Sequence, residues 1–125
     1  MKKLTLIITI IFVSTFCHAQ NWDKVYSINF IKYENGDWVD DKSHRPENTF
    51  IMLKGSEVIV KTNDISRYMT YGKSETTTYN SHVATSWKCL DKEGDECMFI
   101  MKRFNDGTMI YMIIYKTYGV EFYIK

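Results

Sequence analysis

The sequence is poor in the residues that form helices. Beyond residue 19 it contains one alanine (Ala84), two leucines (Leu53 and Leu90) and one proline (Pro46). Isoleucine, valine, threonine, tyrosine and phenylalanine dominate instead, and these residues favour strands. The shortage of helix formers excludes a helical bundle and predicts an all-β fold.

An excess of charge of one sign is also missing. Residues 20–125 carry 14 basic and 15 acidic side chains, a formal charge of −1. Nucleic acids and anionic membranes attract proteins with a basic excess, which this chain lacks. We therefore expect no nucleic-acid partner.

Known catalytic and metal-binding patterns are absent as well. His44 and His82 each follow a serine, but neither serine sits in a Gly-x-Ser-x-Gly elbow. Neighbouring residues on a strand point to opposite faces, which disfavours a serine–histidine pair. Two histidines without cysteine support make a poor zinc site. The sequence predicts no catalytic activity, no cofactor and no metal site; a small hydrolase built on His82 stays an alternative.

Residues 1–19 have the pattern of a signal peptide. Two lysines follow Met1, Leu4–Phe16 is mostly apolar, and Cys17 and Ala19 stand at positions −3 and −1 before Gln20. We expect cleavage near Ala19-Gln20, export to the periplasm or beyond, and no transmembrane segment in the mature chain. The large Phe16 disfavours lipidation at Cys17. The leader resembles those of secreted Bacteroidota-type proteins.

The stretch from Val83 to Tyr115 predicts two successive hairpins. If the first is symmetric about Glu93, Cys89 lies opposite Cys97. Directly opposed antiparallel residues have Cα atoms about 4.5–5.5 Å apart, which a disulfide can span. An even number of cysteines in an exported chain favours such a bond. We therefore predict a Cys89–Cys97 disulfide that pins the hairpin.

The second hairpin turns at Asn105-Asp106-Gly107, a strong turn signal. After it, Thr108–Tyr115 is apolar on both faces. This pattern predicts a strand with the core on one side and an aromatic-rich cover on the other. Apolar residues at spacing two then predict a last strand at the end of the chain.

The first strand, Val25–Glu34, changes phase at Ile31, which predicts a bulge or a sharp bend. The polar stretch Asp40–Asn48 contains Pro46 and predicts a loop. Alternating apolar residues between turn signals predict further strands, the last of them an edge strand, at 49–53, 57–62, 65–71 and 74–79.

Eight or nine short strands with local turns predict a single β domain over residues 20–125. We expect an antiparallel meander that closes into a small barrel or forms a sandwich. The barrel is preferred because nearly every connection is a hairpin and closure removes exposed strand edges. Gly36-Asp37-Trp38 resembles the Gly-x-Trp motif of the lipocalin and calycin superfamily. That resemblance implies a small barrel that carries an apolar ligand.

The candidate ligand-binding residues are aromatic: Trp38, Tyr68, Tyr71 and Tyr79. The three tyrosines surround a hydroxyl-rich segment whose composition suits contact with a sugar or a protein. Ordinary cross-strand tyrosine pairing is the alternative.

These patterns favour an exported small β-barrel binding protein. Its ligand is an apolar small molecule inside the barrel, or a glycan or envelope protein on the surface. The second hypothesis is an envelope interaction or inhibitor module in which the loop Asp40–Asn48 blocks a target.

Overall fold

This computed structural model describes residues 22–124. Within them the chain forms nine antiparallel strands joined by turns and loops, and it forms no helix. The predicted all-β fold is confirmed. The predicted signal peptide and Cys17 lie outside the described residues. The strands are β1 (Asp23–Glu34), β2 (Asp37–His44), β3 (Phe50–Lys54), β4 (Glu57–Lys61), β5 (Ile65–Thr78), β6 (His82–Leu90), β7 (Glu96–Phe104), β8 (Met109–Ile114) and β9 (Tyr118–Ile124).

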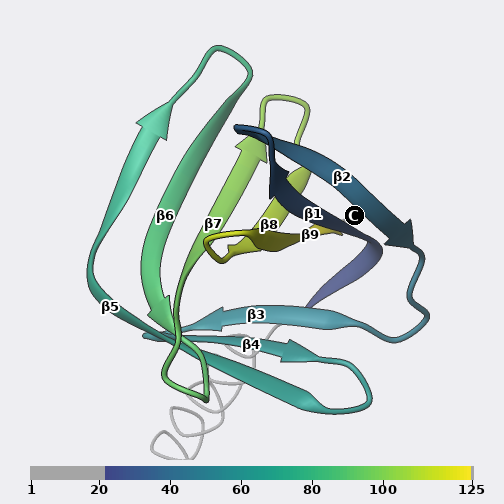
Figure 1. Cartoon of the computed structure of the whole chain (residues 1–125), viewed down its shortest axis with the longest axis vertical. Coiled ribbons are helices and arrows are strands. Elements are labelled where there is room, and N and C mark those ends of the chain that lie inside the picture. Colours follow the sequence, from purple (N-terminus) through teal and green to yellow (C-terminus); the bar gives the residue numbers. More distant parts are fainter. Residues whose placement is uncertain (1–21, 125) are drawn as a thin grey trace, which may run out of the picture.

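Eight of the strands close into a barrel (Figure 1). β1 and β3 to β9 follow one another around the sheet, and β9 pairs back onto β1 from Val25 to Lys32. β2 is an additional strand that pairs with β1 alone in the described part of the chain. The predicted meander therefore closes as a barrel, not as a sandwich.

The middle of the barrel is filled with side chains. The inward-facing residues alternate along each strand with outward-facing ones, as a half-buried strand requires. Phe99 packs at 5.5 Å from Trp87 and at 5.7 Å from Tyr111, measured between ring centroids. The largest fully buried side chains are those of Phe99, Ile51, Ile113, Val25, Val58 and Cys89.

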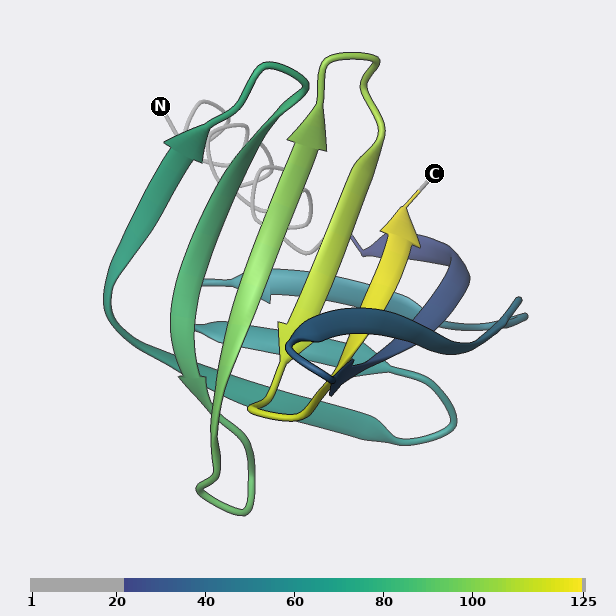
Figure 2. The same ribbon diagram turned by 45° about the horizontal axis from the view of Figure 1, so that its top comes forward.

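Closure of the barrel depends on β1, because this strand pairs through its backbone with three other strands. One edge pairs with β9, while the other pairs with β3 at Asp23–Lys24 and with β2 from Ile28 onward. The register with β2 shifts between Phe30 and Ile31, because Asp41 of β2 has no partner on β1. The irregularity predicted at Ile31 is therefore present in the pairing, but the extra residue lies on β2, and β1 itself pairs continuously with β9 from Ser27 to Lys32. In Figure 2 the β1–β2 hairpin turns out of the barrel and crosses in front of β8 and β9.

A glycine allows the end of β1 to pack tightly on the barrel. Gly119 of β9 pairs with Ile31, and it is buried. A Cβ atom at Gly119 would lie 2.5 Å from Cδ1 of Ile114, 3.1 Å from the carbonyl oxygen of Ile113 and 3.3 Å from Cγ1 of Ile31. The side chains of Ile31 and Ile114 therefore occupy the space in which any residue other than glycine would place its Cβ atom.

Two sequence-based predictions of strand boundaries are wrong. Residues 40–44, predicted as loop, belong to β2, because their backbone pairs with β1 although their side chains are polar and exposed. The segments 65–71 and 74–79 form one long strand, β5, whose pairing with β6 is interrupted between Tyr71 and Glu75. Gly72, at a φ of 73°, bends the strand there instead of ending it.

The predicted Cys89–Cys97 disulfide is also wrong, although the predicted register is right. The two cysteines lie directly opposite each other on β6 and β7, and both are buried free thiols. Cys89 donates a hydrogen bond to the carbonyl oxygen of Trp87 at 3.7 Å. The neighbouring Cys89 thiol, followed by burial, raises the pKa of Cys97 above its ordinary value. Cross-strand opposition fixes the Cα separation, but a disulfide also needs a specific arrangement of the two sulfurs.

We predict that Gly119→Ala lowers the free energy of unfolding by about 1–3 kcal/mol, because it overpacks the contact between Ile31 and Ile114. Urea denaturation measures the loss. The matched background is Ile114→Val, which removes the clashing Cδ1 atom; there Gly119→Ala should cost less. An equal cost in both backgrounds would contradict the steric explanation.

Candidate functional site

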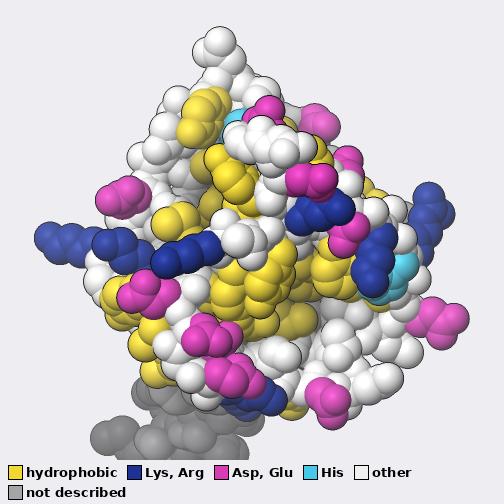
Figure 3. Space-filling model, in the orientation of Figure 1, with side chains coloured by type: hydrophobic (Ala, Val, Ile, Leu, Met, Phe, Trp, Pro, Cys, Tyr) yellow, Lys and Arg dark blue, Asp and Glu magenta, His cyan; other side chains and the backbone are white. Residues whose placement is uncertain are grey.

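The outer face of β7 carries the candidate site. Met98, Ile100 and Lys102 point outward from this strand, and three adjoining depressions share them as lining residues. We call the three together the outer groove, and name its ends after Trp38, Tyr79 and Tyr71, which line them. Figure 3 shows hydrophobic side chains exposed between charged ones on the face of the molecule that Figure 1 presents.

The Trp38 end lies between the β1–β2 hairpin and the outer face of β7–β9. It has a volume of about 420 Å³, within the roughly 300–1,000 Å³ usual for ligand sites. Trp38 is 40% exposed, and its indole meets the ring of Tyr33 edge-on with centroids 5.4 Å apart. The floor is apolar and the rim is charged, through Asp40, Lys102 and Glu121. Its apolar side chains are those of Ile31, Ile100, Met112 and Ile114.

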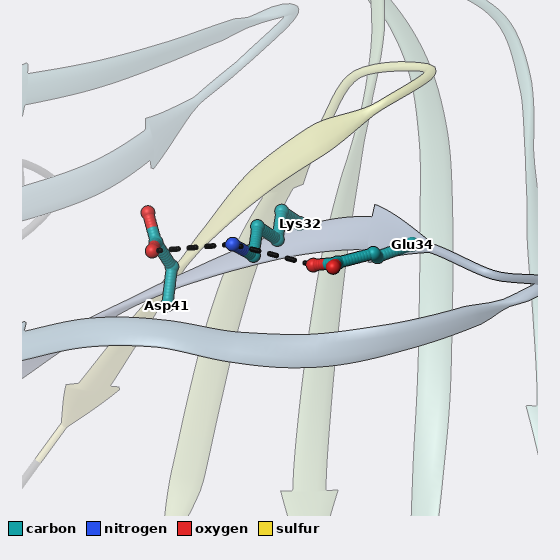
Figure 4. Close-up of polar contacts among 3 residues, drawn as sticks. All are labelled: Lys32, Glu34 and Asp41. Atoms are coloured by element: carbon teal, nitrogen blue, oxygen red, sulfur yellow. Dashed lines mark ion pairs between the residues drawn. The ribbon is translucent and has the colours of Figure 1, made fainter.

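The opposite face of the hairpin carries its ion pairs. Lys32 lies 3.2 Å from Glu34 and 3.9 Å from Asp41, nitrogen to oxygen (Figure 4). All three side chains are about half exposed, so these pairs contribute at most about 1 kcal/mol each. Strand alternation thus separates a charged, solvated face from the aromatic face that borders the groove.

A polar cluster fixes the rim at the Trp38 end. The side-chain amide of Asn29 donates to Oδ1 of Asp40 at 2.9 Å and to Oε1 of Glu121 at 2.8 Å. Burial, followed by the nearby Glu121 carboxylate, raises the pKa of the Tyr123 hydroxyl above its ordinary value. The three residues Asn29, Asp40 and Glu121 come from β1, β2 and β9, so chain closure brings them together.

The Tyr79 end contains a stack of aromatic rings. Tyr79, 54% exposed, stacks on His82 with centroids 4.7 Å apart, and the other neighbour of His82 is Phe104 at 4.9 Å. This end has a volume of about 410 Å³. The imidazole is thus held as part of an aromatic wall.

Ser81 and His82 do meet, contrary to the prediction that they point apart. Ser81 Oγ lies 2.8 Å from Nδ1 of His82, because Ser81 belongs to the turn before β6 and not to the strand. A serine hydrolase needs a third group that orients the histidine. No carboxylate hydrogen-bonds to His82 within residues 22–124.

The Tyr71 end lies where β5 bends. Tyr71 is 40% exposed and borders a depression of about 410 Å³ that also contains Met98 and Tyr115. Tyr71, Tyr79 and Trp38 therefore all line the outer groove, although they come from distant parts of the sequence.

Tyr68 does not join the other three aromatic residues. It faces the barrel interior and packs against the core, where burial raises the pKa of its hydroxyl. The odd spacing between Tyr68 and Tyr71 places them on opposite faces of β5. The sequence shows this odd spacing, and it was the signal that could have separated Tyr68 from Tyr71.

The turn between β6 and β7 is held in place by the side-chain carboxylate of Asp91. Oδ1 of Asp91 accepts hydrogen bonds from the backbone amides of Glu93 (3.0 Å) and Asp95 (2.9 Å), and Oδ2 accepts one from the Tyr115 hydroxyl at 2.7 Å. These bonds, the one from Tyr115 first, lower the pKa of Asp91. Burial and the bond to Asp91 raise the pKa of Tyr115. The acidic turn is therefore a structural element.

The polar cluster was missed by the sequence-based predictions. Glu121 and Asn29 are 92 residues apart, and Asp40 fell in a predicted loop. Alternation alone marked Asn29 and Glu121 as outward-facing, but only the β1–β9 pairing makes them neighbours.

A larger depression, about 920 Å³, lies elsewhere, between the β2–β3 connection and the β7–β8 turn. None of the predicted aromatic residues lines it. Its charged residues are of both signs: Lys24, Arg45, Glu47 and Asp106. This mixture identifies no ligand chemistry, so we favour the outer groove.

Within residues 22–124, no three His, Cys, Asp or Glu side chains converge so as to hold a metal ion. No helix in that range has the length and apolar character needed to cross a membrane. The chain matches no protein-family model, no curated protein and no solved structure. The chemistry of the groove is therefore the basis for assigning a function.

We predict that Asp91→Asn destabilises the protein at pH 7, because an amide cannot accept the Tyr115 hydrogen bond at its nitrogen. The pKa of Asp91 is lowered by folding, so its contribution is present above the unfolded value of about 3.9 and is lost as the pH falls through the folded value. The difference in unfolding free energy between wild type and variant should shrink near pH 3. Urea denaturation at both pH values measures it.

Tyr115→Phe is the control, since it removes the same hydrogen bond from the other side. The double variant Asp91→Asn/Tyr115→Phe should lose less stability than the sum of the two single losses, because both substitutions remove the same hydrogen bond. Its free energy of unfolding should be close to that of either single variant. A loss that is equal at pH 7 and pH 3 would show that Asp91 acts through something other than its charge.

Proposed function

We propose that this chain is an exported, non-catalytic binding protein whose ligand lies in the outer groove. One observation carries the proposal: three of the four aromatic residues selected from the sequence, Trp38, Tyr71 and Tyr79, line adjoining depressions around the outward side chains of β7. Binding sites are typically concave and apolar with a few convergent polar groups, which describes this groove.

The position outside the barrel follows from the packing inside it. Phe99, Ile51 and Val58 are among the side chains that fill the centre, each less than 2% exposed. An apolar ligand inside the barrel, as the lipocalin resemblance implies, would have to displace them. Creating such a space costs several kcal/mol per large side chain removed. Ligand contact on the outer face requires no such rearrangement.

The absence of catalysis is proposed from the chemistry of the groove walls. The Ser81–His82 contact is the nearest approach to a nucleophile and base, and that imidazole packs against the rings of Tyr79 and Phe104 with no carboxylate hydrogen-bonded to it in the described part of the chain. Export rests on the leader pattern of residues 1–19.

An envelope interaction module is the second candidate, and the free edge of β2 favours it. All eight residues of β2 are exposed, and within the described chain the strand pairs with β1 alone. A strand of this kind accepts a further strand from a partner through its backbone. The aspartates at positions 37, 40 and 41 lie on β2 and oppose unspecific pairing, because charge on an edge strand discourages aggregation.

We predict that protein purified from cells expressing the full chain retains a bound small molecule, visible by native mass spectrometry. The triple variant Trp38→Ala/Tyr71→Ala/Tyr79→Ala should lose that bound mass while remaining folded by circular dichroism. Tyr26→Ala is the matched control, because it removes a tyrosine that is 45% exposed but borders the larger depression instead.

A bound mass that survives in the triple variant, or that disappears in Tyr26→Ala, would place the ligand outside the groove. If wild type carries no bound mass, hydrogen exchange with and without envelope extract tests the second candidate. Protection confined to β2 and absent from β7 would favour strand addition.

A further inference from the structure

The Trp38 end of the outer groove presents two unused hydrogen-bond acceptors beside an aromatic ring. Asn29 donates from one nitrogen to Oδ1 of Asp40 and to Oε1 of Glu121, so both oxygens lie within hydrogen-bond distance of the same atom. Oδ2 of Asp40 and Oε2 of Glu121 accept no hydrogen bond from residues 22–124. Both carboxylates line the depression that Trp38 borders.

The two carboxylates are held in place without a ligand. Glu121 is half-buried and bonded to Asn29, and the Tyr123 hydroxyl lies 3.5 Å from the same Oε1 atom. Tyr33 holds Trp38 through an edge-on contact at 5.4 Å. Groups that are oriented before binding lose little conformational freedom when a ligand arrives, which improves affinity.

This set of groups discriminates among ligand chemistries. A wholly apolar ligand would cover two carboxylate oxygens and remove their water without replacing its hydrogen bonds, which is costly. An anion would be repelled by Asp40 and Glu121. A cation would be attracted to them, but Lys102 lines the same depression and opposes it.

A neutral sugar satisfies every group at once. Its hydroxyls donate to the free carboxylate oxygens, and charge-assisted bonds of this type are strong. The face of a pyranose ring that carries C–H bonds is apolar and packs on an indole. The Lys102 ammonium donates to hydroxyl or ring oxygens. The apolar floor below accepts the remaining C–H surface.

We propose that the Trp38 end of the groove is a subsite for a neutral saccharide, with the ring stacked on Trp38 and its hydroxyls donating to Asp40 and Glu121. The proposal rests on the proposed function, since it names the ligand class of the same groove. Two residues have positioning roles: Asn29 holds the carboxylates, and Tyr33 holds the indole.

Isothermal titration calorimetry of the whole processed protein tests this subsite, with neutral oligomers of glucose, mannose, xylose, galactose and N-acetylglucosamine as probes. We expect at least one to bind and to quench tryptophan fluorescence. Trp38→Ala should weaken that probe by about tenfold or more, and so should Asp40→Asn/Glu121→Gln, which keeps side-chain shape but removes both charges. Tyr26→Ala, which removes a tyrosine that borders the larger depression outside the groove, should change the Kd by less than about twofold.

Three results would overturn the saccharide subsite: no probe binds, the bound probe is indifferent to Trp38→Ala, or tetramethylammonium binds more tightly than every sugar and is displaced by salt. The last result would assign the site to a cationic ligand. None of these three results by itself contradicts the proposed function, which is the binding of a ligand in the outer groove. A natural ligand that the triple aromatic variant loses in native mass spectrometry would still place binding in the outer groove. The wild-type melting temperature, kept by each variant, excludes unfolding as the cause of any loss.

Discussion

Pairing between β1 and β9 is the constraint on which the rest of this structure depends. Apart from the two-residue contact of β1 with β3, every other pairing joins strands that are consecutive in the sequence, whereas this one joins the first strand to the last. It satisfies the backbone groups that two open edges would expose, and it turns a curved sheet into a barrel with a single interior. Because it has a high loop-closure cost, it forms only when the inner faces of both strands supply core residues. Val25, Ile28, Phe122 and Ile124 are those residues.

Closure also explains why the groove lies outside. β1 is longer than the barrel needs, and its alternation continues without a break past Ile31, so the face that carries Asn29 also carries Ile31 and Tyr33. From Ile31 onward, the apolar side chains of the hairpin face the outer surface of β8 and β9. The open position at Gly119 lets this hairpin lie close to the sheet. As a result, Trp38 is carried by a strand outside the barrel to a position above residues of β7 and β8.

The parts of the fold that the sequence predicts are those controlled by local pairing. The symmetric hairpin around Glu93 places Cys89 opposite Cys97 and Trp87 opposite Phe99, as in the structure. The phase change at Ile31 marks the place where the apolar residues of β1 change face, but the extra residue of the bulge, Asp41, lies on β2. Strand β2 was partly missed because residues 40–44 bury no side chain; backbone pairing with β1 alone makes them a strand. The polarity of a segment does not reveal this kind of pairing.

The aromatic residues of the candidate site could be selected from the sequence, but the contacts that bring its residues together could not. Alternation separates Tyr68 from Tyr71, yet nothing local brings Asn29 to Glu121, since their contact depends on closure. The same applies to the disulfide, for which register is necessary but the positions of the sulfurs decide.

The apolar outer face of β8 connects these observations. A strand that is apolar on both faces needs two layers of cover, and the sequence predicts an aromatic-rich cover for the outer one. The β1–β2 hairpin supplies that cover for Met112, which is 8% exposed, but it does not extend across β7, where Met98 is 38% exposed. Apolar surface left at the edge of a partial cover is stabilised by any ligand that completes it. The free carboxylate oxygens of Asp40 and Glu121 line this edge, so the ligand that we propose is one that is apolar on one side and rich in hydrogen-bond donors on the other.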